Sequence, residues 1–231
     1  MNKILGLILA RSGSKRLPNK NIIEIKGKPL IYYSIQAAKR SKFISEIYVS
    51  SDSLEILDIS KKYNSKVFLR DKKFAEDKTS SEESIREFLL ANPNLVKKFS
   101  YLCLLQPTSP LRDENDIDDC IKLLDNSKAR SVISVCNPNY KFSKYLCLNK
   151  DKSIKNQASK FNYDSGFNEN YYPNGAVYIF EIDSFLKTNS IIQNTCLPYL
   201  MKNLKSIDID TYDDLAYLKY ILSEKYIDNI N

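Results

Sequence analysis

The chain has 231 residues, of which 43% are hydrophobic, and it carries a net charge of +7 with no histidine. This length is enough for one large core, and the excess of positive charge indicates an anionic partner. The absence of histidine excludes a Ser-His-Asp triad, a Cys-His dyad and any histidine-ligated metal site. Five cysteines without a Cys-x-x-Cys pair indicate buried thiols in a reducing cytoplasm rather than disulfides or structural zinc. The first apolar run is too short for a signal peptide or a membrane span, so we expect a cytoplasmic protein without a membrane partner.

Short apolar runs alternate with amphipathic segments along the chain. The runs predict strands over residues 4–10, 47–51, 66–69, 101–105, 132–136 and 176–180. Apolar residues at helical spacing predict helices over residues 30–40, 81–91, 115–125 and 211–224. This alternation predicts an α/β fold, a Rossmann-like and mostly parallel sheet with helices on both faces, in one domain over residues 1–231. Ligands of such sheets bind at the carboxyl ends of the strands.

The alternation breaks over residues 137–172, a polar segment rich in asparagine and in aromatic residues. Its many Tyr and Phe residues are poor material for a disordered loop. We therefore predict an inserted, hairpin-like excursion, with a turn at residues 149–151, that packs against another surface such as a second subunit.

The loop that follows the first strand, residues 10–21, carries four cations and one glycine: Arg11, Lys15, Arg16, Lys20 and Gly13. It fits neither the G-x-G-x-x-G pattern nor the P-loop pattern. Its backbone N–H groups at residues 12–14 can form a small nest for an anion, and its cations can neutralise a polyphosphate. The alternative is a solvated basic turn, which the mutual repulsion of four cations disfavours.

The remaining cations are scattered among acids, whereas a DNA-binding face usually shows a basic stripe along one helix. We therefore expect no nucleic acid partner. A basic nucleic-acid-binding protein is kept as the alternative from a different functional class.

Two acids near the end of the chain, Asp208 and Asp210, alternate with apolar residues in the stretch SIDID. If this stretch is extended, both side chains point to the same side, about 7 Å apart, and can jointly bind a hard cation such as Mg²⁺. The alternative is that Asp210 assists the following helix. However, Thr211 and Asp214 already have the spacing of a helix-capping pair.

Further polar residues follow two of the predicted strands. Gln106 ends one of them, and its amide can donate and accept hydrogen bonds, which suits an acylamino sugar. Arg112, in the same loop, is expected to bind a ligand or to pair with a helix acid. Arg70 ends another strand, and either Ser80 or Ser81 is expected to cap the helix that follows it.

Six stretches, in order, resemble the motifs of the acylneuraminate cytidylyltransferases, also called CMP-sialic acid synthetases, including the bacterial relatives that activate legionaminate and pseudaminate. They are LARSGSKRLPNKN (9–21), EIYVSSD (46–52), VFLRDKKFAEDKTSSEES (67–84), LLQPTSPLR (104–112), PNGAVYIF (173–180) and SIDIDTYDDL (206–215). The resemblance covers residues 3 to about 220. It implies the nucleotide-diphosphosugar transferase type of fold, with a homodimer built through the 137–172 excursion.

The resemblance also implies a reaction and a set of site residues. CTP and a nonulosonic acid would give a CMP-sugar and pyrophosphate with Mg²⁺ as cofactor, and Arg11, Lys20 and Asp210 would be catalytic. The implied nucleotide contacts are Ala10, Arg11, Ser12, Gly13, Ser14, Lys15, Lys20, Asn21, Arg70, Thr79 and Ser81. The implied sugar contacts are Gln106, Thr108, Lys144 and Tyr178, and the implied metal ligands are Asp208 and Asp210.

The chain departs from the family pattern near the acceptor site. Many relatives have Arg-Gln about eight residues before the Pro-Asn-Gly motif and an arginine just before its proline, where this chain has Asp164, Ser165 and Tyr172. An arginine expected near the sugar carboxylate is therefore missing, and N-acetylneuraminate, legionaminate and pseudaminate all stay open as acceptors. The nearest alternative activity is CTP-dependent activation of 3-deoxy-manno-octulosonate, and a further alternative is an inactive nucleotide sensor.

Overall fold

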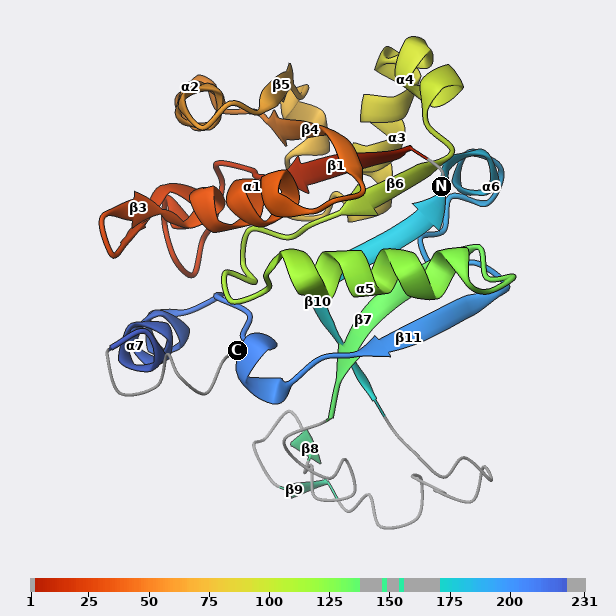
Figure 1. Ribbon diagram of the computed structural model, residues 1–231. Coiled ribbons are helices and arrows are strands. Elements are labelled where there is room, and N and C mark those ends of the chain that lie inside the picture. The colour runs from red at the N-terminus through yellow and green to blue at the C-terminus, as the bar shows by residue number, and fades with distance from the viewer. Residues whose placement is uncertain (1–2, 138–146, 149–153, 156–170, 224–231) are drawn as a thin grey trace.

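The computed structural model describes residues 3–137, 147–148, 154–155 and 171–223, and a seven-stranded sheet forms its centre (Figure 1). The strands are β1 (Ile4–Leu9), β4 (Ile44–Ser51), β5 (Lys66–Leu69), β6 (Tyr101–Leu104), β7 (Ser131–Cys136), β10 (Tyr172–Glu181) and β11 (Cys196–Leu200). Their order across the sheet is β11-β7-β10-β6-β1-β4-β5. Strand β10 runs antiparallel to both of its neighbours, and the other pairs are parallel. The prediction of a mostly parallel sheet is confirmed.

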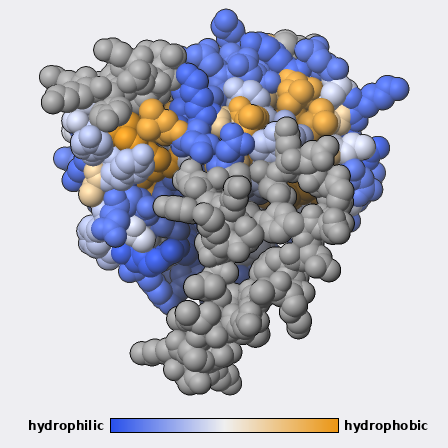
Figure 2. Space-filling view, turned by 90° about the horizontal axis from the view of Figure 1, so that it is seen from below, coloured by the Kyte–Doolittle hydropathy of each residue, from blue (hydrophilic) through white to orange (hydrophobic). Residues whose placement is uncertain are grey.

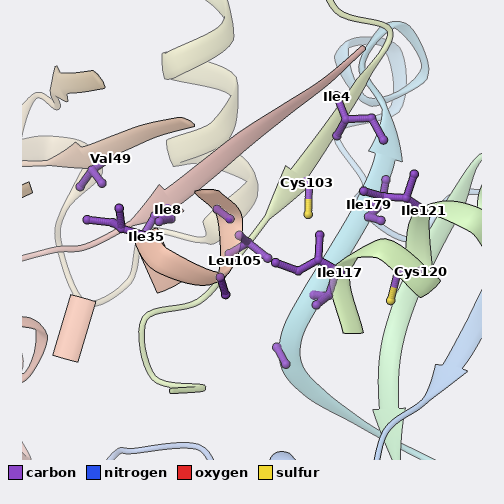
Figure 3. Packing of buried hydrophobic residues seen from close by; sticks show 14 of the residues in the cluster. Ile4, Ile8, Ile35, Val49, Cys103, Leu105, Ile117, Cys120, Ile121 and Ile179 are labelled. Carbon is purple, nitrogen blue, oxygen red and sulfur yellow. The ribbon is translucent and has the colours of Figure 1, made fainter. Parts of the chain in front are cut away.

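Helices cover both faces of the sheet. Helices α1 (Leu30–Arg40), α2 (Leu54–Lys62) and α5 (Glu114–Asp125) pack on one face, and α3 (Ser81–Ala91), α4 (Pro93–Lys98) and α6 (Ile182–Thr188) pack on the other. The alternation of side chains along β1 explains this arrangement, because Ile4 and Ile8 join the first core and Leu5 and Leu7 join the second. Figure 3 shows the first core, where Ile35 lies beside Ile8 and Ile117 lies near Leu105.

Four elements of the sheet and its covering were not expected from the sequence: α2, α4, α6 and the edge strand β11. The three helices have nine, six and seven residues, too short to give a strong periodic signal. Strand β11 contains Pro198, which a sheet tolerates at its edge.

Smaller elements join these layers. They are the 3-10 turns η1 (Lys20–Ile22), η2 (Lys72–Phe74) and η4 (Asn203–Lys205), and the two-stranded pair β2 (Glu24–Ile25) and β3 (Lys28–Pro29). Within the predicted excursion over residues 137–172, β8 (Cys147–Leu148) and β9 (Ile154–Lys155) form a short antiparallel pair. This pair agrees with a hairpin around the predicted turn, and most of the excursion lies outside the described residues.

A third apolar cluster ties the start of the chain to its end. Leu17 of the cationic loop and Ile209, which lies between the two late acids, are both fully buried and belong to the same cluster. Leu215, Leu218 and Ile221 of α7 (Tyr212–Ile221) also belong to it. The hydrophobic effect thereby fixes the loop over residues 10–21 beside the segment over residues 206–210.

The cysteines whose side chains are described are free thiols and most of them are buried, as the sequence predicted. Cys103, Cys120 and Cys136 are buried, Cys196 is partly buried, and all four are free thiols. Burial raises the pKa of the Cys103 thiol to about 12, against the opposing effect of Arg112. Among the described residues no helix is both long and apolar enough to cross a membrane. Seen from below, the surface is mostly hydrophilic and carries a few apolar patches (Figure 2).

Candidate active site

A pocket of about 290 Å³ opens at the carboxyl ends of β1, β5 and β6. Because these strands are parallel, the loops after them meet at one edge of the sheet, as doubly wound folds require. Ten residues that the sequence had indicated line the pocket: Arg11, Lys20, Asn21, Arg70, Thr79, Ser81, Gln106, Thr108, Asp208 and Asp210. A second cavity, of about 270 Å³, adjoins it and shares five of its lining residues, Arg11, Lys20, Asn21, Asp77 and Asp210. Ser14, Lys15 and Arg16 line the second cavity.

The cationic loop is held by hydrogen bonds at both ends. The Ala10 N–H group donates to the Ser50 carbonyl (3.0 Å), and the buried Asn21 amide donates to the Arg11 carbonyl (2.9 Å). The loop therefore has a defined shape before any ligand binds.

The anion nest expected at residues 12–14 is not free in this structure. The Ser12 N–H group donates to Asp52 (2.9 Å), its hydroxyl donates to the same carboxylate (2.5 Å), and the Ser14 N–H group donates to the Ser12 carbonyl (2.9 Å). The reason is that Asp52, which follows β4, brings a carboxylate to the place where an external anion was expected.

All four loop cations are paired with two carboxylates. Asp210 accepts from Lys20 (2.7 Å) and Arg16 (2.5 Å), and Asp77 accepts from Arg11 (3.0 Å) and Lys15 (2.5 Å). The alternative that the sequence disfavoured, a turn of mutually repelling cations without partners, does not describe this loop, because acids from two distant segments neutralise it.

Lys20 is the most enclosed of these cations. Its side chain is 14% exposed, compared with 68% for Arg16 and 83% for Lys15. Burial alone would raise the pKa of Asp210, but the hydrogen bonds and charges of Lys20 and Arg16 outweigh burial and lower that pKa below its ordinary value.

Asp208 and Asp210 reach the pocket as the alternation predicted. Ile209 between them is fully buried, and its N–H group donates to the Thr108 carbonyl (2.9 Å), which ties this segment to the loop after β6. Asp208 is an exposed residue that lines the pocket. The protein atoms around its carboxylate nevertheless raise its pKa, and the charge of Asp210 adds to the effect against a hydrogen bond from Thr108.

The segment over residues 206–210 is anchored at both of its ends. On one side, the Lys205 ammonium is buried between the carboxylates of Asp113 (2.5 Å) and Asp116 (3.2 Å) at the start of α5. On the other side, Thr211 and Asp214 form the predicted capping box of α7. Capping therefore does not occupy the side chains of the acid pair.

The acid pair has the chemistry of a magnesium site completed by a substrate. No group of three or more carboxylate, thiol or imidazole side chains gathers at any point of the described chain. Mg²⁺ is commonly held by one or two carboxylates, with water and phosphate oxygens as the remaining ligands. The residues present fit such an ion in the company of a phosphate-containing ligand.

Arg70 points buried guanidinium nitrogens at the pocket. The residue is 4% exposed, and within the described part of the chain its Nε and Nη2 atoms have no hydrogen-bond partner. Burial lowers the pKa of Arg70, and the charges of Asp52 and Glu87 oppose that effect. Unpaired buried donors cost free energy, so this group is suited to receive acceptor atoms from a ligand.

Residues 74–84, which follow Arg70, form the wall of the pocket that lies across from the cationic loop. Ser80 is the N-cap of α3, in a capping box with Glu83, as the sequence had indicated for one of two serines. The Thr79 hydroxyl donates to the Lys73 carbonyl (3.1 Å). Ser81 begins the helix, so its N–H group is one of those that an α-helix leaves without an internal partner.

Gln106 is positioned by its neighbours. Its carbonyl accepts from the hydroxyl of Ser34 (3.2 Å) and from Arg112 (3.3 Å), while its side chain faces Gly175 in β10. Arg112 is almost fully buried and also donates to Ser34 (2.7 Å), and burial lowers its pKa to about 10. Arg112 therefore supports the loop after β6 through carbonyls and a hydroxyl, rather than by pairing with a helix acid.

Two of the implied sugar contacts, Tyr178 and Lys144, are not among the described residues that line the two cavities. Tyr178 is half-buried in β10 and is absent from the residues that line either cavity in the described chain. Burial raises its pKa, and the charge of Asp208 adds to this effect. Lys144 lies outside the described residues.

Sequence reasoning missed the partners of the loop. Asp52 and Asp77 occur within stretches that carry the family resemblance, but nothing in their spacing indicated contacts with Ser12, Arg11 or Lys15. Asn174 was also missed, although it is buried and donates to Ser206 (2.8 Å) while its side-chain oxygen accepts from Ser134 (2.6 Å). Asn174 belongs to the Pro-Asn-Gly motif that carries part of the family resemblance, and this motif was the available signal.

The fold and the pocket together define a class of protein. An α/β sheet that presents clustered cations and an acid pair at its carboxyl edge has the architecture of a protein that binds phosphate-containing ligands such as nucleotides. The chain belongs to the cytidylyltransferase family, whose sequence profile matches residues 5–227.

Individual relatives are similar over most of the chain. It is 36% identical over 229 residues to the N-acylneuraminate cytidylyltransferase of Escherichia coli O18:K1:H7, covering 96% of this chain and 53% of that protein. It is 30% identical to a pseudaminic acid cytidylyltransferase of Campylobacter jejuni and 32% identical to the CMP-N,N'-diacetyllegionaminic acid synthase of Legionella pneumophila, covering 95% of this chain and 96% of each protein. The chain thus spans about half the length of the first relative and nearly all of the other two.

Solved structures share the fold. CMP:2-keto-3-deoxy-manno-octonic acid synthetase complexed with CTP aligns with a TM-score of 0.72 at 14% identity, over 96% of this chain and 99% of that chain. The 4-diphosphocytidyl-2C-methyl-D-erythritol synthase of Anaerococcus prevotii aligns with a TM-score of 0.68 at 17% identity, over 96% and 97%. This likeness confirms the expected type of fold.

Proposed function

We propose that the chain activates a sialic-acid-type nonulosonic acid, converting CTP and the sugar acid into a CMP-sugar and pyrophosphate. One observation carries the proposal: Lys20 and Asp210, separated by 190 residues, meet in a pocket that Arg70 and Gln106 also line. The names of the three similar proteins, which refer to N-acylneuraminate, pseudaminic acid and legionaminic acid, support an acceptor of this class.

The two cavities suggest how the substrates divide the site. The triphosphate would lie along the cationic loop, with Arg11, Lys15 and Lys20 as counter-charges. The cytosine would lie against Arg70 and the segment over residues 79–81, near Asn21. The acceptor would lie against Gln106 and Thr108, and Lys144 and Tyr178 are proposed as further sugar contacts.

The reaction forms a bond from the anomeric oxygen of the sugar to the α-phosphorus and breaks the bond to the leaving pyrophosphate. Negative charge builds on that pyrophosphate, and Arg11, Lys15 and Lys20 would stabilise it, which is the dominant contribution in phosphoryl transfer. The chain has no histidine, so we assign the proton of the attacking hydroxyl to a carboxylate of the Asp208 and Asp210 pair.

Asp208 and Asp210 would hold Mg²⁺, which when bound neutralises phosphate charge and acidifies a bound hydroxyl. Asp210 also orients Lys20 and Arg16. The loop cations and the acid pair would in this way act on one triphosphate.

We also propose that residues 1–231 form one nucleotidyltransferase domain, and that the excursion over residues 137–172 serves a homodimer interface. The β8–β9 pair supports a hairpin within it. Light scattering on the purified protein, with and without this excursion, tests the dimer.

The decisive experiment offers the protein CTP, UTP, ATP or GTP with Mg²⁺ and each of four acceptors: N-acetylneuraminate, a legionaminate, a pseudaminate and 3-deoxy-manno-octulosonate. Pyrophosphate release and the mass of the sugar nucleotide are measured. We expect release with CTP and one nine-carbon acid.

The other outcomes separate the alternatives. Release with the eight-carbon acid alone would favour the octulosonate activity, and CTP binding without release would indicate an inactive sensor. A salt-sensitive shift of labelled DNA or RNA, without CTP binding, would favour a nucleic-acid-binding protein.

A further inference from the structure

Asp77 lies across the pocket from the loop over residues 10–21, and its carboxylate forms ion pairs with two of the four loop cations. Its Oδ1 atom lies 3.0 Å from Arg11 and its Oδ2 atom lies 2.5 Å from Lys15. Asp77 and Arg11 line both cavities, so these ion pairs stand where the two cavities join.

The part of the chain that carries Asp77 is an exposed turn between η2 and α3. The base of this turn is closed by the Thr79 N–H group, which donates to the Glu76 carbonyl (3.1 Å), and by the Thr79 hydroxyl, which donates to the Lys73 carbonyl (3.1 Å). Asp77 lies at the tip, and its side chain is 38% exposed. Exposed ion pairs of this kind are weak, so a polyanion can replace the carboxylate without disturbing the base of the turn.

Asp77 differs in this respect from Asp210. Asp210 neutralises the other two cations but also belongs to the acid pair, and it is anchored by α7 through its N–H group, which donates to Asp214 (3.0 Å). Asp77 has no such second task among the described residues. Its carboxylate presents two oxygens to two cations, which is the pattern that a phosphate group also offers.

We propose that Asp77 is an internal competitor of the triphosphate, which holds Arg11 and Lys15 until a bound polyphosphate displaces it. The inference rests on the proposed function, because it takes CTP as the ligand of the loop. Asp77 then lowers the affinity for CTP and for the pyrophosphate product, and it makes release of that product easier. A phosphate group that binds Arg11 or Lys15 has to exchange with the Asp77 carboxylate that is already in place.

A simpler structural role gives the opposite expectation. If Asp77 mainly orders Arg11 and Lys15 for the ligand, then its removal loosens both side chains and weakens binding. The sign of the change in affinity therefore decides between competition and ordering.

The test is isothermal titration of the wild-type protein, Asp77→Asn and Asp77→Ala with CTP, pyrophosphate and cytidine at one fixed ionic strength. Both variants are expected to bind CTP and pyrophosphate about three- to tenfold more tightly, the size expected for release from two exposed ion pairs. Cytidine has no phosphate, so its affinity is expected to stay unchanged.

The matched control is Asp58→Asn, which removes an exposed carboxylate paired to Lys61 (2.9 Å) on α2, outside both cavities. It is expected to leave all three affinities unchanged. Weaker or equal binding of CTP and pyrophosphate by the Asp77 variants would overturn the inference, as would an equal shift for cytidine. Failure of the wild-type protein to bind CTP would instead contradict the proposed function.

Discussion

Gly175 stands so close to Gln106 that a Cβ atom at position 175 would lie 2.5 Å from the Gln106 Oε1 atom. Gly175 also has a φ of +78°, in the left-handed region that favours glycine. The close approach fixes where the Gln106 amide can lie, because the amide is the flexible partner of the two.

Replacing Gly175 by alanine should therefore move the Gln106 amide. We expect the KM for the acceptor sugar to rise about tenfold, the equivalent of one hydrogen bond, while the affinity for CTP stays unchanged. Steady-state kinetics with the identified acceptor and titration with CTP measure the two quantities.

A matched control exists in the same chain. Gly27 has a similar φ of +71°, but nothing lies within 4 Å of the place that a Cβ atom would take there, so Gly27→Ala carries the backbone strain without the contact. An equal rise of KM in both variants would show that strain, and not the displaced amide, is the cause. The double variant Gln106→Ala with Gly175→Ala should be no worse than Gln106→Ala.

Lys20 should be the loop cation on which turnover depends most, since it is the most enclosed of the four and contacts Asp210. We expect Lys20→Ala to lower kcat about a hundredfold, or about 3 kcal/mol of transition-state stabilisation. The exposed Lys62 on α2 offers the control, because Lys62→Ala removes the same charge away from the pocket. Near-normal turnover of the Lys20 variant would contradict its role.

Asp208 should set the requirement for metal. Chelation should abolish pyrophosphate release, and Asp208→Asn should raise the Mg²⁺ concentration for half-maximal activity about tenfold or more. Asp213, an exposed acid in the first turn of α7, is the control position. If Asp213→Asn raises the requirement as much, or if Asp208→Asn leaves it unchanged, then the acid pair is not the metal site.

Asp210 should stabilise the fold at neutral pH through its two cations. Its pKa is lowered in the folded state, so its contribution is present above the ordinary carboxyl pKa of about 3.8 and is lost as the pH falls through the lowered value. Because its side chain is one-third exposed, we expect Asp210→Asn to lose about 1 kcal/mol of unfolding free energy at pH 7. Urea unfolding between pH 7 and pH 3 should show this difference shrinking with falling pH. A difference that stays constant, or that Asp213→Asn reproduces, would argue against the ion pairs as its source.

The sequence was informative where a local pattern has one structural solution. The apolar run over residues 101–105 was correctly predicted as a strand, because an apolar run this short is typical of a strand that is buried on both faces. The alternation of SIDID around Ile209 correctly indicated that both acids share a side, and the spacing of Thr211 and Asp214 correctly indicated a cap.

What sequence reasoning missed depends on contacts between distant segments. Asp77 and Asp52 look like ordinary surface acids until the fold brings them to the loop over residues 10–21. The contact between Ser12 and Asp52 was missed for the same reason, because Asp52 arrives from the end of a different strand. Short elements such as α6 escaped because seven residues hold too few turns for a period to be visible.

The apolar cluster that joins Leu17 to Ile209 has a consequence for how the protein is made. One wall of the pocket comes from the loop over residues 10–21, near the start of the chain. Asp208 and Asp210, which face this loop, are held in place by α7, a helix that ends at Ile221. During synthesis the early strands can pair while this helix is still inside the ribosome, yet the pocket then has an open side and no acid pair. A nascent chain should therefore complete this pocket in a single late step, when α7 docks.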